Sequence, residues 1–173
     1  MNATQPEATA ATHSEAVAKL SKLINGIQFT MMTTIDTEGC LRSRPMATQQ
    51  TEFDGTLWFF TGASTTKVSE IGHDQHVNLS YADPTHNRYV SVSGRAQMVR
   101  DSAKAKELWN PMLKAWFPKG LEDPELALLR VDVEKAEYWD SPASTVVYIV
   151  GFLKAIATGK KLENAGDHEK LRM

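Results

Sequence analysis

The sequence predicts a mainly β protein, an antiparallel barrel with helices at its periphery. Segments rich in β-branched and aromatic residues recur through the middle of the chain, and turn residues bound each of them. Helical periodicity appears before and after these segments and in two of the connections. About six strands in hairpin order favour an antiparallel barrel over a doubly wound parallel sheet. At 173 residues, the chain fits one domain with one core.

The predicted strands are short and each lies between clusters of Gly, Asp, Asn or Pro. They span residues 29–35, 41–48, 57–61, 77–81, 89–99 and 128–139. The first two are joined by Asp36-Thr37-Glu38-Gly39, a turn that has glycine where a left-handed residue is needed. Pro45 removes one backbone donor from the second strand, so we expect that strand to lie at an edge or to carry a bulge.

Helices are predicted at 12–26, 67–72, 101–109 and 141–157. The first begins at Thr12 and Glu15, which have the spacing of a capping box, and ends at Gly26. The residues before it lack any periodicity. We therefore expect a flexible N-terminal tail (1–12), a single domain with flanking helices (13–157) and a polar C-terminal tail (158–173).

Composition limits the classes of function. A net charge of −2 gives no broad basic field, so we do not expect nucleic acid as a partner. The N-terminus does not resemble a secretion signal, and no apolar run approaches the roughly 20 residues that span a bilayer, so we expect a cytoplasmic protein without a membrane partner. The single cysteine, Cys40, excludes a disulfide within the chain. His73, His76 and His86 lack the context of a metal motif, so no metal site is expected.

The most informative segment runs from Trp58 to Lys67, where an aromatic strand ends in a loop of small and hydroxyl residues. Lys67 follows this loop in the first turn of a predicted helix. Backbone N–H groups, helix polarity and a cation can together hold a phosphate. The pattern is not the nucleotide-binding P-loop, because no glycine directly precedes Lys67. An ordinary strand-to-helix cap with a solvated lysine explains this segment more simply when it is taken alone.

A second cationic segment precedes it, Leu41-Arg42-Ser43-Arg44-Pro45-Met46. Arg42 and Arg44 point to the same face of a strand and there need an anion, a carboxylate or water. The planar fork of arginine suits phosphate. An exposed edge strand with solvated charges is the alternative. Taken together, the two segments place cations and hydroxyls beside an aromatic wall, which suits a phosphorylated planar ring.

These segments resemble the general stress protein branch of the pyridoxamine-5'-phosphate oxidase-like split barrels. The motifs that carry the resemblance keep the family's order from Met31 to about Trp139. They are the segment 41–46, the segment 57–61 followed by 64–67, Val77 to Pro84, Tyr89 to Gly94, Trp116-Phe117-Pro118 and Glu137 to Pro142. The resemblance implies an FMN-binding split β-barrel and a homodimer with flavin at the subunit interface.

By position, the resemblance also implies the contacts of the flavin. Arg44 and Lys67 would hold the FMN phosphate, with Ser64 and Thr66 as hydroxyl donors. The backbones of Arg42, Ser43, Pro45 and Met46 would lie along the ribityl chain and the ring edge, and Phe60 and Thr61 would continue that wall. The candidates to cover the ring, from the same subunit or the other one, are Trp116 and Trp139.

The sequence departs from the oxidases at two places. Tyr89 stands where they have a ring-contacting glutamine, and their C-terminal Arg/His segment that holds pyridoxamine phosphate has no clear match. These departures argue against oxidation of pyridoxamine phosphate but not against flavin binding. Three functions stay open: an FMN-dependent oxidoreductase acting on an unknown small molecule, a flavin-binding or flavin-sensing stress protein without turnover, and a split barrel that binds haem or a deazaflavin. FAD could replace FMN.

Overall fold

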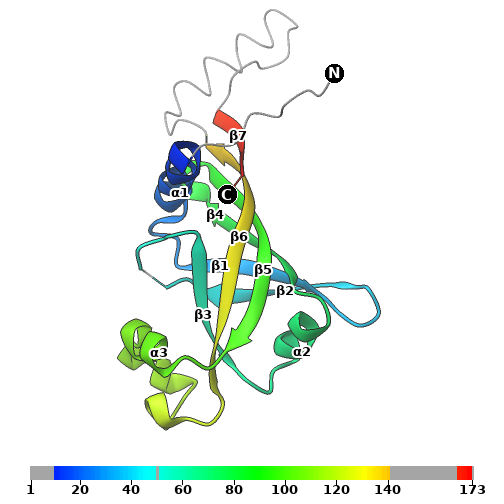
Figure 1. Ribbon diagram of the computed structural model, residues 1–173, viewed down its shortest axis with the longest axis vertical. Helices are drawn as coiled ribbons and strands as arrows, with labels where there is room; N and C mark the ends of the chain where they lie inside the picture. The colour runs from blue at the N-terminus through cyan, green and yellow to red at the C-terminus, as the bar shows by residue number, and fades with distance from the viewer. Residues whose placement is uncertain (1–9, 50, 141–166, 173) are drawn as a thin grey trace, which may run out of the picture.

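The computed structural model describes residues 10–49, 51–140 and 167–172. One antiparallel sheet of seven strands curls into a half-barrel, and the helices lie around it (Figure 1). The strand order is β2-β1-β4-β5-β6-β3, with β7 paired to β6. The predicted fold class, a mainly β antiparallel split barrel with peripheral helices, is confirmed.

The six predicted strands are all present, with ends shifted by at most a few residues. The strands are β1 (Phe29–Ile35), β2 (Leu41–Ala47), β3 (Thr56–Gly62), β4 (His76–Asp83), β5 (Arg88–Val99), β6 (Leu126–Asp140) and β7 (Asp167–Arg172). The last of them lies in the segment expected to be a polar tail. β3 pairs with β6 only as far as Asp132, and β7 pairs with β6 from Lys135 to Asp140. β7 therefore pairs with the part of β6 that β3 leaves unpaired. The polar sequence of β7 does not predict this pairing.

Helices and short 3-10 turns connect and flank the strands. They are α1 (Ala10–Ile24), α2 (Thr66–His73), α3 (Ser102–Leu108), η1 (Pro84–His86), η2 (Pro111–Ala115) and η3 (Gly120–Glu122). α1 begins at Ala10, so Thr12 lies inside the helix rather than at its cap. Asp101 caps α3 by accepting a hydrogen bond from the Lys104 N–H at 2.9 Å. The predicted helix 141–157 lies outside the described residues.

None of these helices is both long and apolar enough to cross a lipid bilayer, within the described part of the chain.

The core lies between the inner face of the curled sheet and the apolar face of α1. Residues of β3 alternate strictly, with Leu57 and Phe59 buried and their neighbours half-exposed. Leu20 of α1 is fully buried against this face. The alternation fixes which side chains of each strand point into the barrel, and it also determines which ones remain outside.

A glycine is required where β5 bends. The register between β5 and β6 shifts between Ser93 and Gly94. A Cβ atom at Gly94 would lie 2.3 Å from the backbone oxygen of Asp132, a contact that only backbone movement could relieve. This close approach explains the glycine in the long central strand.

We expect Gly94→Ala to lower the free energy of unfolding by about 2 kcal/mol or more, because the new methyl group meets backbone rather than a flexible side chain. Chemical denaturation measures this. Gly72→Ala is the matched control, since a Cβ there meets nothing within 4 Å. That change, in α2, should be neutral or stabilising by up to about 1 kcal/mol. Equal stability of the two variants would contradict the close approach.

Candidate functional site

The cationic residues of β2 lie on the inner face of an edge strand. β2 ends the strand order, so the first of the two positions that Pro45 predicts, an edge or a bulge, is the one observed. Arg42 stands opposite Thr34, and Arg44 opposite Met32, both of which are buried residues of β1. Cross-strand partners share a face, so both arginine side chains leave β2 on the inner side. Helix α2 packs against β1 and β5 beside them.

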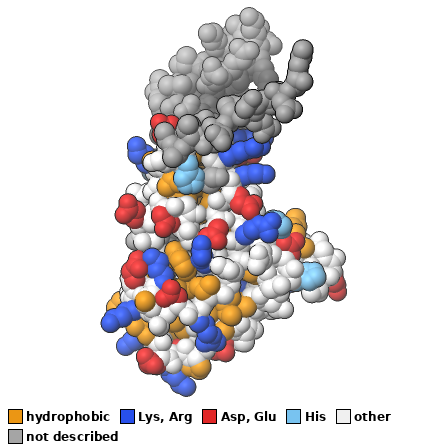
Figure 2. Space-filling model, viewed as in Figure 1, with side chains coloured by type: hydrophobic (Ala, Val, Ile, Leu, Met, Phe, Trp, Pro, Cys, Tyr) orange, Lys and Arg blue, Asp and Glu red, His pale blue; other side chains and the backbone are white. Residues whose placement is uncertain are grey.

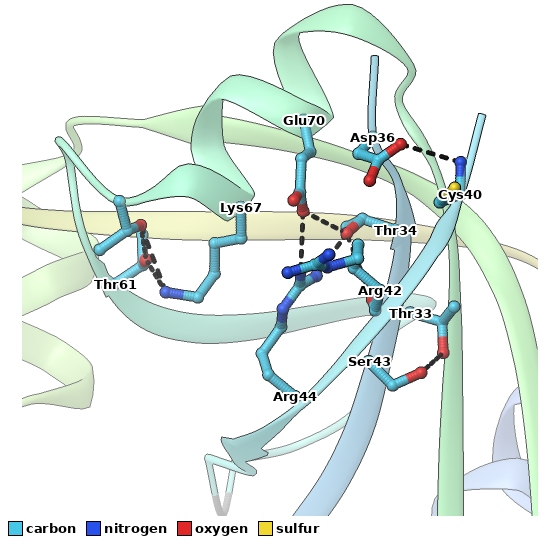
Figure 3. Close-up of polar contacts among 11 residues, drawn as sticks. Thr33, Thr34, Asp36, Cys40, Arg42, Ser43, Arg44, Thr61, Lys67 and Glu70 are labelled. Carbon is cyan, nitrogen blue, oxygen red and sulfur yellow. Dashed lines mark hydrogen bonds and ion pairs between the residues drawn. The ribbon is translucent and has the colours of Figure 1, made fainter. Parts of the chain in front are cut away.

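Arg44 is held by a buried acid and a buried hydroxyl. Its Nη2 donates to Glu70 Oε2 at 2.7 Å, and its Nη1 donates to Thr34 Oγ1. The Thr34 hydroxyl in turn donates to the same carboxylate oxygen at 2.5 Å. Glu70 is 5% exposed and Thr34 is fully buried. Figure 3 shows Glu70 reaching from α2 to the guanidinium of Arg44, so a closed ring of three polar groups joins α2, β1 and β2.

Lys67 lies on the same helix, where two hydroxyl groups accept its hydrogen bonds. Its Nζ donates to Thr61 Oγ1 and to Thr65 Oγ1, each at 3.2 Å. No carboxylate of the described residues lies within ion-pair distance of it. Burial lowers the pKa of Lys67 below its ordinary value; the charge of Arg44 acts in the same direction and that of Glu70 opposes both. The ammonium is therefore in a place that favours an added anion.

The small-residue loop before α2 already binds a carboxylate of the chain. The backbone N–H and the hydroxyl of Ser64 both donate to Glu125 Oε2, at 3.0 and 2.6 Å. These bonds lower the pKa of Glu125. Ser64, predicted to donate to a phosphate, thus donates to Glu125 here, whereas Thr66 is exposed at the start of the helix. The backbone N–H and the hydroxyl of Ser64 are therefore both occupied by a carboxylate of the chain.

The remaining residues predicted along β2 and β3 divide between the two faces of the sheet. Met46 and Thr61 are buried on the inner side. Ser43 and Pro45 are exposed on the outer side, where the Ser43 and Thr33 hydroxyls lie 2.7 Å apart. The side chain of Phe60 points away from Thr61, because neighbours on a strand face opposite sides. For Phe60, only the backbone can contribute to a wall beside Lys67.

Phe60 instead packs beneath the segment that follows α3. Its ring lies 6.0 Å from that of Trp109 at an interplanar angle of 84°, and 6.4 Å from that of Phe117. Trp116, next to Phe117, is 70% exposed. Figure 2 shows hydrophobic side chains gathered over the lower part of the molecule, the end that carries α3.

The two tryptophans predicted to cover the ring lie at different places in the fold. Trp139 is near the end of β6 beside Tyr89, and it is 42% exposed. Phe60 pairs with Leu128 near the start of β6, and the eleven residue steps from Leu128 to Trp139 span roughly 35 Å of strand. Phe60 and Trp139 therefore lie towards opposite ends of β6.

Other parts of the described residues give weaker evidence for a binding site. A hollow of about 520 Å³ between α3, η3 and the start of β6 contains none of the predicted flavin contacts. No group of three or more His, Cys, Asp or Glu residues in the described part of the chain could hold a metal ion. His76 and His86 each contact a neighbouring aspartate, Asp74 and Asp83, at 2.7 Å on the surface.

Sequence reasoning missed Glu70 and Thr34. Thr34 reads as an ordinary strand residue, and Glu70 as a polar residue of a short helix. One signal was present, because Lys67 and Glu70 are three residues apart and so share a face of the helix. That spacing places a carboxylate beside the predicted phosphate-binding lysine, although it does not identify the arginine that pairs with it.

Comparison with known proteins relates the whole fold to one family. The family model described as pyridoxamine 5'-phosphate oxidase-like matches residues 15–163. The protein bli-3 of Neurospora crassa is 34% identical over 156 residues, which cover 84% of this chain and 75% of that protein.

Solved structures agree with this relationship. The general stress FMN/FAD binding protein of Xanthomonas citri is 31% identical, with 73% of this chain and 89% of that chain covered and a TM-score of 0.63. A Jannaschia sp. CCS1 protein given the name general stress protein 26 is 20% identical, with 94% and 99% covered and a TM-score of 0.72. The second similarity supports the fold alone.

We expect Lys67→Met to stabilise the unliganded protein by less than about 1 kcal/mol, because the ammonium is partly desolvated but still screened by water. In the unchanged protein, the unfolded chain holds a proton on Lys67 at pH values where the folded chain has lost it. Its free energy of unfolding therefore rises with pH between the lowered pKa and the ordinary value of 10.5.

Denaturation over a pH series checks this, and Lys67→Met should lack that rise. Lys106→Met, at an exposed position of α3, is the control and should keep the pH profile of the unchanged protein. A lower stability of Lys67→Met at neutral pH would contradict the desolvation argument.

Proposed function

Since the chain belongs to the pyridoxamine 5'-phosphate oxidase-like family, we propose that it is a flavin-binding general stress protein that holds FMN at Arg44 and Lys67. The observation that carries the proposal is the pair of cations at the open edge of the barrel. Arg44 and Lys67 bring two positive charges against the one negative charge of Glu70, which leaves one positive charge uncompensated. A phosphate monoester is the natural partner of such a cluster.

The state of Lys67 supports the same ligand. An ammonium whose pKa burial has lowered gains more from an anion than a solvated one does. Thr61 and Thr65 hold its side chain, so the cation is positioned before any ligand arrives. The name of the Xanthomonas citri relative, an FMN/FAD binding protein, agrees with a flavin phosphate at this position. We propose FMN as the ligand, with FAD as the alternative.

We further propose that the bound flavin makes the protein an oxidoreductase for a small molecule. The flavin would supply the electron transfer, and this chain would bind its phosphate and orient it. The acid nearest to the site, Glu70, is engaged by Arg44 and Thr34 and so is not placed to act on a substrate. That observation favours, as a second candidate, a flavin-binding stress protein without turnover. Oxidation of a nicotinamide donor by the flavin-loaded protein separates the two.

We propose that the flavin site is completed by a second copy of the chain. The outer face of β1 carries Phe29 and Met31, which are 60% and 43% exposed although pairing to β2 and β4 fills both edges of the strand. Along the same face, cross-strand register leads from Met31 through Ser80 and Ser91 towards Tyr89 and Trp139. Exposed apolar side chains on a sheet face are typical of an interface.

A second copy seated on this face would also bury Trp139, which is 42% exposed beside Tyr89 near the end of β6. The exposed face and Trp139 therefore support the same arrangement, a homodimer with flavin between the subunits.

Purified protein mixed with FMN and desalted should retain the flavin absorption bands. Arg44→Ala combined with Lys67→Ala should weaken FMN binding by about 3–6 kcal/mol, since charge-assisted hydrogen bonds to a phosphate contribute about 1.5–3 kcal/mol each. Isothermal titration measures the difference.

The control removes the same charges elsewhere. Lys106→Ala combined with Arg130→Ala deletes one lysine and one arginine from α3 and the middle of β6. Its FMN affinity should stay within about threefold of the unchanged protein. Unchanged affinity of the Arg44/Lys67 double variant would contradict the assignment of the phosphate site.

Sedimentation should show a dimer, and Met31→Arg should shift it towards monomer and weaken FMN binding together. A charge placed in the middle of an apolar interface leaves an unpaired, desolvated cation. Met112→Arg is the control, because Met112 is 76% exposed on η2, away from this sheet face. A monomeric protein that binds FMN tightly would refute the interface site.

A further inference from the structure

We propose that Glu70 and Thr34 are positioning residues that set the orientation of Arg44 for a ligand phosphate. This inference rests on the proposed flavin site and goes beyond it, because it assigns a task to two residues that do not contact the ligand. Arg44 donates from Nη2 to Glu70 at 2.7 Å and from Nη1 to Thr34. These two nitrogens form the terminal edge of the guanidinium, so the ring of contacts fixes that edge within the protein (Figure 3).

The contacts to Glu70 and Thr34 do not use the side edge of the same guanidinium. A guanidinium has five N–H donors in a rigid plane, and Nε with one hydrogen of Nη2 forms a second fork. No hydrogen bond joins Nε of Arg44 to any part of the chain that the structure describes. The side chain of Arg44 is about one-fifth exposed, so it is not closed off from solvent. The arrangement leaves the side fork for two oxygens of a phosphate.

The positioning residues belong to rigid elements. Thr34 is fully buried in β1, where it pairs with Arg42 of β2, and Glu70 is 5% exposed in α2. Thr34 accepts from Arg44 and donates to Glu70 at 2.5 Å, so its hydroxyl is used in both roles. A flexible arginine that is already immobilised loses less conformational freedom when a ligand binds.

Glu70 could instead compete with the phosphate for Arg44, and the two roles predict opposite changes in affinity. Riboflavin lacks the phosphate, so a comparison of FMN with riboflavin separates these two roles from a general effect on folding. If Glu70 positions Arg44, its removal weakens FMN binding and leaves riboflavin binding unchanged. If Glu70 only stabilises the fold, both affinities change together. If it competes, FMN binding becomes tighter.

The experiment measures the dissociation constants of FMN and riboflavin by quenching of flavin fluorescence, for the full chain and its variants. Glu70→Ala should weaken FMN binding about fivefold to tenfold, as expected when one long side chain must be ordered during binding. Glu70→Gln keeps an acceptor for Arg44 and should recover FMN affinity to within about threefold. Riboflavin affinity should stay the same in both variants.

Thr34 provides a second, independent pair of variants. Thr34→Val preserves the shape of the side chain and should reduce the preference for FMN over riboflavin, whereas Thr34→Ser keeps the hydroxyl and should retain it. Equal losses for the two ligands, or tighter FMN binding by Glu70→Ala, would overturn the positioning role. The proposed function fails separately, if the unchanged protein does not prefer FMN to riboflavin or if Arg44→Ala does not reduce that preference.

Discussion

The ion pair between the buried Glu70 and the partly exposed Arg44 is the contact on which the arrangement of the site depends. It joins α2, which follows β3, to the edge strand β2 from a different hairpin. A carboxylate that is 5% exposed would be strongly destabilising without a partner, so loss of Arg44 would leave a buried charge behind. The same physical requirement that keeps α2 against the sheet therefore brings Lys67 and Arg44 to one place.

That place combines two kinds of cation with different roles. Arg44 is neutralised within the protein and fixed in direction, whereas Lys67 is held by hydroxyls and remains uncompensated. Desolvation opposes the charge on Lys67, and a bound anion would relieve this. A site of this type is less stable when empty than when filled. Such a cost is common where a protein prepares a charge for a ligand rather than for its own fold.

Curvature of one sheet produces both the core and the apolar outer face. The inner side is closed by α1 and α2, while Phe29, Met31, Tyr89 and Trp139 stay exposed on the outer side. Strand alternation makes this unavoidable, since a strand with apolar residues on both faces needs cover on both. The proposed second copy would supply that cover.

The sequence by itself determined six of the seven strands, an edge or bulged position for β2, and the face shared by Arg42 and Arg44. These follow from alternation, turn residues and Pro45, which act within a few residues of the chain. Only the tertiary structure decided that Glu70 pairs with Arg44, that Glu125 occupies the donors of Ser64, and that β7 completes the ladder of β6. Each of these contacts joins segments 26 or more residues apart, and no local pattern specifies which distant segments become neighbours.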